Sequence, residues 1–193
     1  MRRGSSTVVA IVGAAPPALL ETLGRAPNVA ALEAEDASLE EAARTLARAE
    51  GVASPYVVVA ADPLGEVAQQ WSAMWSPGSV DHSFDETAGV LVAEWRSGRV
   101  ELPDYYIVVA AEEVHAAQFH LGFLKSERPA RVILVPLSEH SGELAPSVLA
   151  VLPVLPQGPW WPAVDRLMDA AREYFPGTIT PEARAPSEVI RTQ

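Results

Sequence analysis

Acidic side chains stand directly after several apolar runs of this 193-residue chain, where they could bind a metal ion. Asp62, Glu35 and Glu112 each follow such a run, and Glu33 or Asp36 could take the place of Glu35. The carboxyl ends of parallel strands share one edge of a sheet, so these carboxylates could converge there. Oxygen ligands alone suit Mg²⁺ better than Zn²⁺. The pattern therefore predicts a Mg²⁺ site of Asp62, Glu35 and Glu112.

Acid–base chemistry is a second use for residues at the same sheet edge. Asp62, Glu113 and His115 form the candidate catalytic set, with His140 as an alternative to His115, because a histidine exchanges protons near neutral pH. A structural interpretation stays open, since helix dipoles attract carboxylates to helix N-termini. Asp62 before Pro63 is also the expected start of a helix, with the carboxylate as its cap.

Small-molecule binding would use the loop after the first apolar run. This loop contains a single glycine and no lysine, so it matches neither a P-loop nor a dinucleotide-binding fingerprint. It is either a tight turn between a strand and a helix or an anion site at a helix N-terminus. The predicted ligand-binding residues are Gly13, Ala14, Ala15, Asp62, Ser138 and His140.

One loop sequence has a known counterpart. Residues 13–23 read G-A-A-P-P-A-L-L-E-T-L, which resembles the G-x-x-P-x-x-x-x-E-T-L loop of CRISPR-associated Rossmann-fold domains. The resemblance implies a dimeric, Rossmann-like sensor of cyclic oligoadenylates. The chain has neither the later Gly-Gly-Thr-Lys segment of that family nor the Arg-x4-6-His nuclease signature of its effector partners.

The elements that must position these residues follow from apolar patterning. Short apolar runs without alternation predict strands covered on both faces, at 7–12, 28–34, 56–61, 105–110 and 131–135. Apolar positions at helical spacing predict helices at 39–50, 64–75, 84–96, 112–125 and 163–175. Ser38 and Glu41 form a capping box at the first of these helices. The alternation predicts a three-layer α/β/α sandwich with a mostly parallel sheet of five to six strands, Rossmann-like or flavodoxin-like in type.

Two segments allow other interpretations. Residues 84–97 favour a helix, but 90–95 and 99–102 could instead pair as a hairpin. The run 148–155 predicts an antiparallel edge strand, because the polar loop before it leaves little room for a helix and Pro153 fits a sheet edge. We expect residues 1–176 to form one domain, followed by a C-terminal extension, exposed or disordered, at 177–193.

Composition excludes several function classes. The chain carries 25 Asp and Glu against 14 Lys and Arg, a net charge of -11, which argues against nonspecific binding to nucleic acid or to an anionic membrane. It has no cysteine, so thiol nucleophiles and cysteine-ligated metal centres are excluded. No stretch reaches the roughly 18 apolar residues of a membrane span. We therefore expect a cytoplasmic protein.

Trp160 and Trp161 are adjacent, so both cannot face one core, and exposed tryptophans are common in protein interfaces. They predict a homodimer that buries at least one of the two rings. The function that these features favour is a non-catalytic module that binds a small molecule or a protein partner. A Mg²⁺-assisted hydrolase or phosphoryl-transfer enzyme and a nucleotide sensor are the alternatives, so the sequence does not decide whether the protein is an enzyme.

Overall fold

The computed structural model describes residues 6–15, 18–74, 83–110, 118–137 and 144–174. Within them five parallel strands form one sheet in the order β2-β3-β1-β4-β5. The strands are β1 (Thr7–Gly13), β2 (Val29–Glu33), β3 (Tyr56–Ala60), β4 (Tyr105–Ala110) and β5 (Val132–Pro136). All five predicted buried strands are confirmed, each to within one residue at either end.

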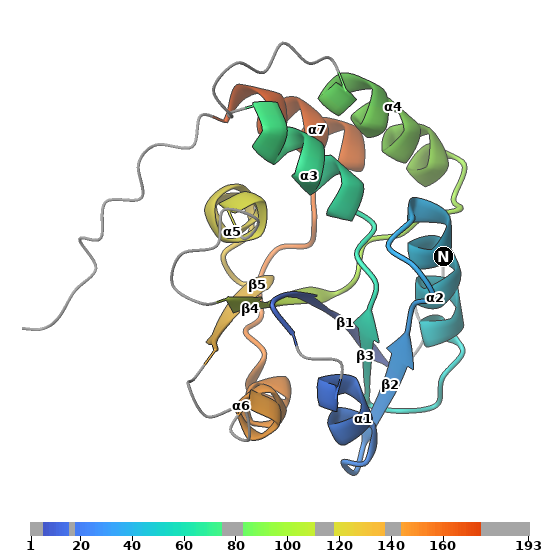
Figure 1. Ribbon diagram of the computed structural model, residues 1–193, viewed down its shortest axis with the longest axis vertical. Helices are drawn as coiled ribbons and strands as arrows, with labels where there is room; N and C mark the ends of the chain where they lie inside the picture. Colours follow the sequence, from blue (N-terminus) through green and yellow to red (C-terminus); the bar gives the residue numbers. More distant parts are fainter. Residues whose placement is uncertain (1–5, 16–17, 75–82, 111–117, 138–143, 175–193) are drawn as a thin grey trace, which may run out of the picture.

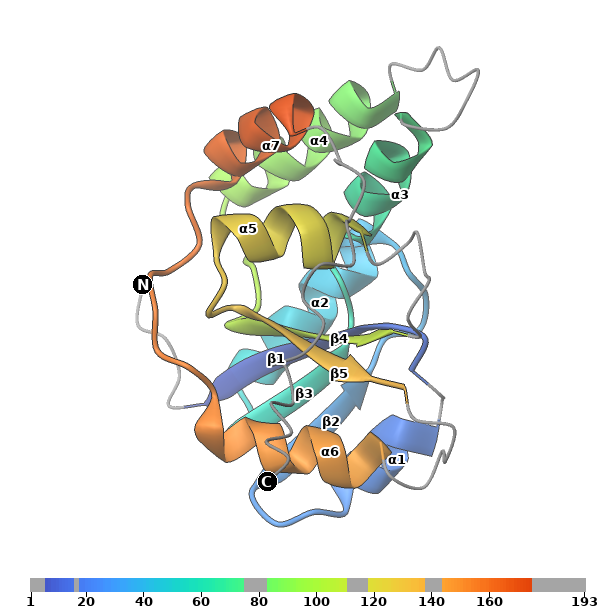
Figure 2. The same cartoon turned by 90° about the vertical axis from the view of Figure 1, so that its left-hand side faces the viewer.

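Helices cover both faces of the sheet, which confirms the three-layer α/β/α sandwich (Figure 1). On one face lie α1 (Ala18–Gly24) and α6 (Leu144–Val151) (Figure 2). The opposite face carries α2 (Leu39–Glu50), α3 (Gly65–Met74), α4 (Ser83–Arg96), the π-helix η2 (Phe119–Leu124) with its continuation α5 (Lys125–Glu127), and α7 (Val164–Glu173). None of the helices in the described ranges is long and apolar enough to cross a membrane.

The strand order separates this sheet from both expected types. A Rossmann sheet has the order 3-2-1-4-5 and a flavodoxin sheet 2-1-3-4-5, whereas here β1 lies between β3 and β4 and β2 forms the edge. All neighbouring pairs are parallel. The carboxyl end of β3 is therefore placed directly beside that of β1.

Local sequence signals explain where α2 begins and where α4 ends. The Ser38 side chain accepts a hydrogen bond from the Glu41 amide at 3.2 Å, which is one half of the predicted capping box, while the Ser38 amide donates to the Asp36 carboxylate instead of to Glu41. The segment Ser83–Arg96 is helical, which excludes the hairpin alternative. It turns at Gly98, whose positive φ of 73° suits glycine after a helix. Residues 112–117 of the predicted helix 112–125, and the extension 177–193, lie outside the described residues.

The predicted edge strand at 148–155 is wrong, because this run belongs to α6 and the short 3-10 turn Leu152–Val154 that follows it. Leu144, Val148 and Leu152 are four residues apart, and all three are buried against the sheet. Pro146 stands in the first turn of α6, where its missing N–H costs no hydrogen bond. Within the described residues the sheet therefore has five strands and not six.

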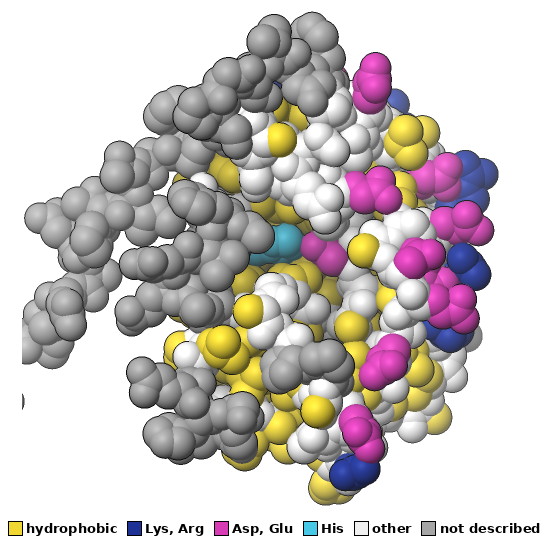
Figure 3. Space-filling view, viewed as in Figure 1, with side chains coloured by type: hydrophobic (Ala, Val, Ile, Leu, Met, Phe, Trp, Pro, Cys, Tyr) yellow, Lys and Arg dark blue, Asp and Glu magenta, His cyan; other side chains and the backbone are white. Residues whose placement is uncertain are grey.

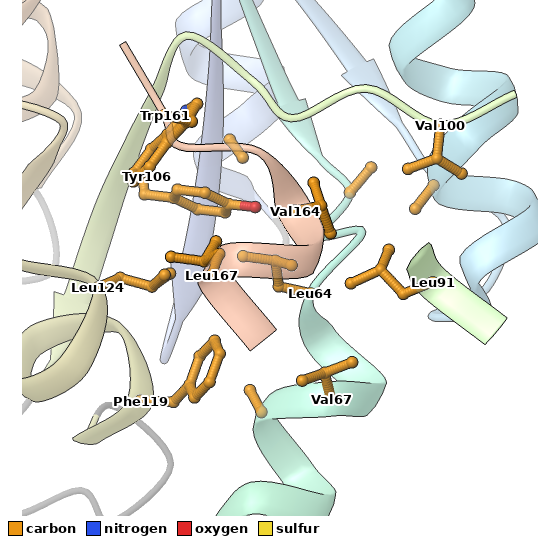
Figure 4. Close-up of a cluster of buried hydrophobic side chains, with 14 of the residues drawn as sticks. Leu64, Val67, Leu91, Val100, Tyr106, Phe119, Leu124, Trp161, Val164 and Leu167 are labelled. Carbon is orange, nitrogen blue, oxygen red and sulfur yellow. The ribbon is translucent and has the colours of Figure 1, made fainter. Parts of the chain in front are cut away.

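The larger core lies between the sheet and the helices on the α3 side, and Figure 4 shows part of it. Trp71 of α3 is fully buried there, and its indole N–H donates to the carbonyl of Ala171 in α7 at 2.9 Å. This confirms that the apolar stripe of α3 serves packing. Tyr106 of β4 lies between Trp161 and the η2 helix in the same cluster.

Candidate ligand site at the carboxyl edge of the sheet

The topology creates a crevice between the carboxyl ends of β1 and β3, because the connections that follow these two strands run to opposite faces of the sheet. The chain leaves β1 through α1 on one face of the sheet, and it leaves β3 and β4 over the opposite face. Right-handed crossovers require this, because β2 and β4 lie on opposite sides of β1. Open α/β sheets bind ligands at such switch points, outside the carboxyl ends of the strands.

A cavity of about 900 Å³ occupies this position. The ends of β1, β2 and β3 form its floor, and residues at the start of α2, on α3 and on η2 form its walls. Most of the lining side chains are alanine, glycine or valine, which leaves the centre open. The polar side chains in the lining are those of Asp36, Asp62, Gln69, Ser72 and His120.

Gly13 closes the end of β1 in a way that only glycine allows. Its φ is +95°, and a Cβ at this position would lie 2.2 Å from the carbonyl oxygen of Val109. The amide of Ala14 donates to the same Val109 oxygen at 2.8 Å. Of the residues predicted to bind a ligand, Gly13 and Ala14 line the cavity, while Ala15 packs with the core on the opposite face. The loop is thus a tight turn, and the Ala14 amide is engaged within the protein.

Asp62 lies at the bottom of the cavity and caps the start of α3. Its Oδ1 accepts hydrogen bonds from the Leu64 amide at 2.8 Å and from the Tyr106 hydroxyl at 3.1 Å. The side chain is 15% exposed, and this exposure is toward the cavity that Asp62 lines. The helix-cap interpretation is therefore correct. It does not use the second carboxylate oxygen, Oδ2.

His120 faces that second oxygen. Its Nε2 lies 3.0 Å from Oδ2 of Asp62, and its side chain is 5% exposed. The contact does not form a hydrogen bond, and within the part of the chain that the structure describes Nε2 is a buried polar atom without a hydrogen-bond partner. Contacts with the rings of Tyr106 and Phe119, at centroid distances of 5.2 and 5.5 Å, hold the imidazole in place. Figure 3 shows a histidine and a carboxylate side by side in a hollow of this face.

The sequence gives little indication that His120 belongs to a site. It stands in the apolar segment F-H-L-G-F-L, which predicts a core position, whereas the candidate histidines His115 and His140 follow predicted strands. The available signal is the π-helix itself, because π-turns are rare and are enriched at functional sites. A π-helix is recognised from its hydrogen bonds in the structure and not from the sequence.

The Asp62 carboxylate acts on a third group, the phenol of Tyr106. Burial, and then the negative charge of Asp62 and the hydrogen bond to it, hold the pKa of Tyr106 well above its ordinary value of 10.0. Tyr106 is therefore a hydrogen-bond donor to Asp62 at neutral pH. This bond engages Oδ1 of Asp62 and leaves its Oδ2 beside Nε2 of His120 at the floor of the cavity.

Comparison of the chain with known protein families, curated proteins and solved structures gave no significant match. The chemistry of the cavity is therefore the basis for assigning a function.

Two of the predicted metal ligands, Asp62 and Glu35, line different hollows. Glu35 lines a separate hollow of about 490 Å³ on the outer side of α2, and its amide donates to the carboxylate of Glu41. Its neighbours on either side in the chain face the Asp62 cavity, because successive residues of an extended segment point in opposite directions. The described part of the chain contains no group of three His, Asp or Glu side chains placed to hold a metal ion. The remaining predicted site residues lie outside the described residues; they are Glu112, Glu113, His115, Ser138 and His140.

The tryptophan pair lies at the amino ends of β4 and β5, away from the cavity. Trp161 is 6% exposed, and its indole N–H donates to the carbonyl of Pro103 at 2.7 Å. Trp160 is half-buried, with its ring 4.4 Å from the guanidinium of Arg131. Trp161 thus belongs to the core of one chain, and an interface at this position would use Trp160. The homodimer itself stays a prediction.

Proposed function

We propose that this protein binds a small polar molecule in the switch-point cavity, and that Asp62 and His120 contact it. The observation that supports this is the His120 side chain, which is buried, lines the cavity beside Asp62, and has an Nε2 atom without a hydrogen-bond partner among the described residues. Leaving such an atom unpaired costs about 1–3 kcal/mol in a folded protein. A ligand that bonds to Nε2 would remove this cost.

The size and position of the cavity fit the proposal. Pockets for small molecules typically measure about 300–1,000 Å³ and combine apolar walls with a few polar groups. The cavity of about 900 Å³ has this composition. A Mg²⁺-assisted enzyme has less support, because Asp62 and Asp36 share the cavity but no group of three His, Asp or Glu placed to hold a metal ion lies among the described residues.

Native mass spectrometry with a cavity-filling variant tests the proposal. Wild-type protein incubated with the fraction of a cell extract below about 1 kDa should retain a small molecule after desalting, as an added mass. Ala60→Phe should abolish this added mass, because Ala60 is an exposed position in the cavity lining, at the end of β3. Ala47→Phe is the matched control, since Ala47 is exposed on α2 outside the cavity.

Retention of the molecule by Ala47→Phe and its loss from Ala60→Phe is the expected pattern. Wild-type protein that retains nothing, or an Ala60→Phe variant that retains as much as wild type, would refute the proposal.

A further inference from the structure

We infer that the ligand of this cavity is an unphosphorylated polyol, such as a free sugar, with one hydroxyl group that approaches Asp62 and His120 from the cavity side. This inference rests on the proposed function and adds the chemical class of the ligand. Three observations lead to it: the pairing of a donor with an acceptor at the cavity floor, the charge of the lining, and the absence of an aromatic platform among the described lining residues.

The floor of the cavity presents an acceptor beside a donor. Oδ2 of Asp62 is a carboxylate oxygen and can only accept a hydrogen bond while ionised. Nε2 of His120 is a donor in the tautomer that carries its proton there, which is the tautomer that suits a carboxylate oxygen 3.0 Å away. A hydroxyl group is the simplest partner for both atoms, because it donates one hydrogen bond and accepts two. An ammonium group cannot accept from Nε2, and a carbonyl cannot donate to Oδ2.

The lining does not suit a phosphate group. It contains no Lys or Arg among its described residues, and it contains the carboxylates of Asp36 and Asp62. Hydrogen bonds from the Ser38 side chain and amide lower the pKa of Asp36, so this carboxylate stays ionised at neutral pH. Two amides at the starts of the loops that follow β1 and β3 are engaged, that of Ala14 with Val109 and that of Leu64 with Asp62.

The remaining polar groups fit a ligand with several hydroxyls. The Ser72 hydroxyl donates to the carbonyl of Ala68 at 2.8 Å, so its oxygen is oriented to accept. The Asp36 carboxylate and the Gln69 amide offer further hydrogen-bonding groups on the wall. Apart from the His120 imidazole, no aromatic ring lines the described part of the cavity, so nothing there would stack on a nucleobase.

Titration calorimetry with matched pairs of ligands tests the inference. The probes are D-ribose, D-glucose, D-galactose and myo-inositol, each compared with its monophosphate ester, together with adenosine and spermidine. At least one free polyol should bind wild type about tenfold or more tightly than its phosphate ester, since the lining repels the added charge. Binding should weaken about tenfold or more in His120→Phe and in Asp62→Asn, and stay unchanged in Ala47→Phe.

Two variants are used because either one alone could lose binding through misfolding, and thermal melting checks that both fold. A phosphate ester, adenosine or spermidine that binds best, with loss of binding in Ala60→Phe, would overturn the polyol and leave the proposed function standing. If all probes fail while the extract still supplies a retained molecule, the polyol is likewise overturned. If no small molecule is retained from the extract either, both proposals fall.

Discussion

Removing the hydroxyl group of Tyr106 isolates one hydrogen bond of the site without creating a cavity. In Tyr106→Phe the ring stays fully buried against Trp161 and His120, and only the bond to Oδ1 of Asp62 is lost. A hydrogen bond to a charged group contributes about 1.5–3 kcal/mol to stability. Asp62 keeps its bond from the Leu64 amide and is partly exposed to solvent, which places the cost near the lower limit. We expect a loss of about 1.5 kcal/mol at pH 7.

The same variant has a distinct pH dependence. In the unfolded chain Tyr106 has its ordinary pKa of 10.0, and in the folded protein burial and the charge of Asp62 hold its pKa well above this value. The stabilisation is therefore complete below pH 10 and is lost as the pH rises from 10 toward the folded pKa. By pH 11 wild type should have lost about 1.4 kcal/mol that Tyr106→Phe cannot lose. The two free energies of unfolding should become nearly equal near pH 11.

Urea denaturation followed by fluorescence at pH 7, 9, 10 and 11 measures both effects. Tyr105→Phe is the control at pH 7, because the Tyr105 hydroxyl donates to the neutral carbonyl of Pro156 at 3.1 Å. Its loss should cost about 0.5–1 kcal/mol. A gap between wild type and Tyr106→Phe that stays constant from pH 9 to pH 11 would refute the raised pKa of Tyr106. No loss of stability at pH 7 would refute the hydrogen bond to Asp62.

Two further predictions concern the turn after β1 and the tryptophan pair. Gly13→Ala should lower the free energy of unfolding by about 3 kcal/mol or more, because the new Cβ meets the carbonyl oxygen of Val109 in addition to the strained φ. Gly98→Ala, with a similar φ of +73° but open space around it, should cost only about 1 kcal/mol in the same urea titration, and equal losses would contradict the close approach at Gly13. Trp160→Ala should cost about 1 kcal/mol through the lost contact with Arg131, and unchanged stability would contradict that contact. Light scattering should show a homodimer for wild type at micromolar concentration and its dissociation in Trp160→Ala, and a monomeric wild type would refute the homodimer.

Burial explains why most elements were predictable from the sequence. Val57, Val58 and Val59 are fully buried, so the strand lacks the alternation of a half-exposed strand and reads as one apolar run. The α6 helix is apolar in the same uniform way, with Leu149 and Val151 also partly packed. Its helical period is therefore hidden, and the run reads as a strand. Uniform apolarity identifies burial but does not distinguish a short helix from a strand.

The candidate site was predictable in part. Asp62 could be predicted because it directly follows a buried strand, and this position can be read from the order of residues in the sequence. Glu35 was grouped with it because both follow strands, but a single step along the chain turns Glu35 away from the cavity. His120 reaches Asp62 because η2 packs against α3, whose first turn follows Asp62. The contact between His120 and Asp62 depends on the path of the chain between the strands, and the pattern of apolar and polar residues does not predict that path.

The bond from Trp71 to Ala171 has a consequence for the order of folding during synthesis. It joins residues 100 positions apart, and Trp161 fills the core over Tyr106 from the same late part of the chain. Contacts between such distant residues form slowly, because a long loop must close first. We expect the face of the sheet under α3 to stay exposed on the ribosome until α7 has emerged. A nascent chain that stalls before residue 161 would present this apolar surface to chaperones.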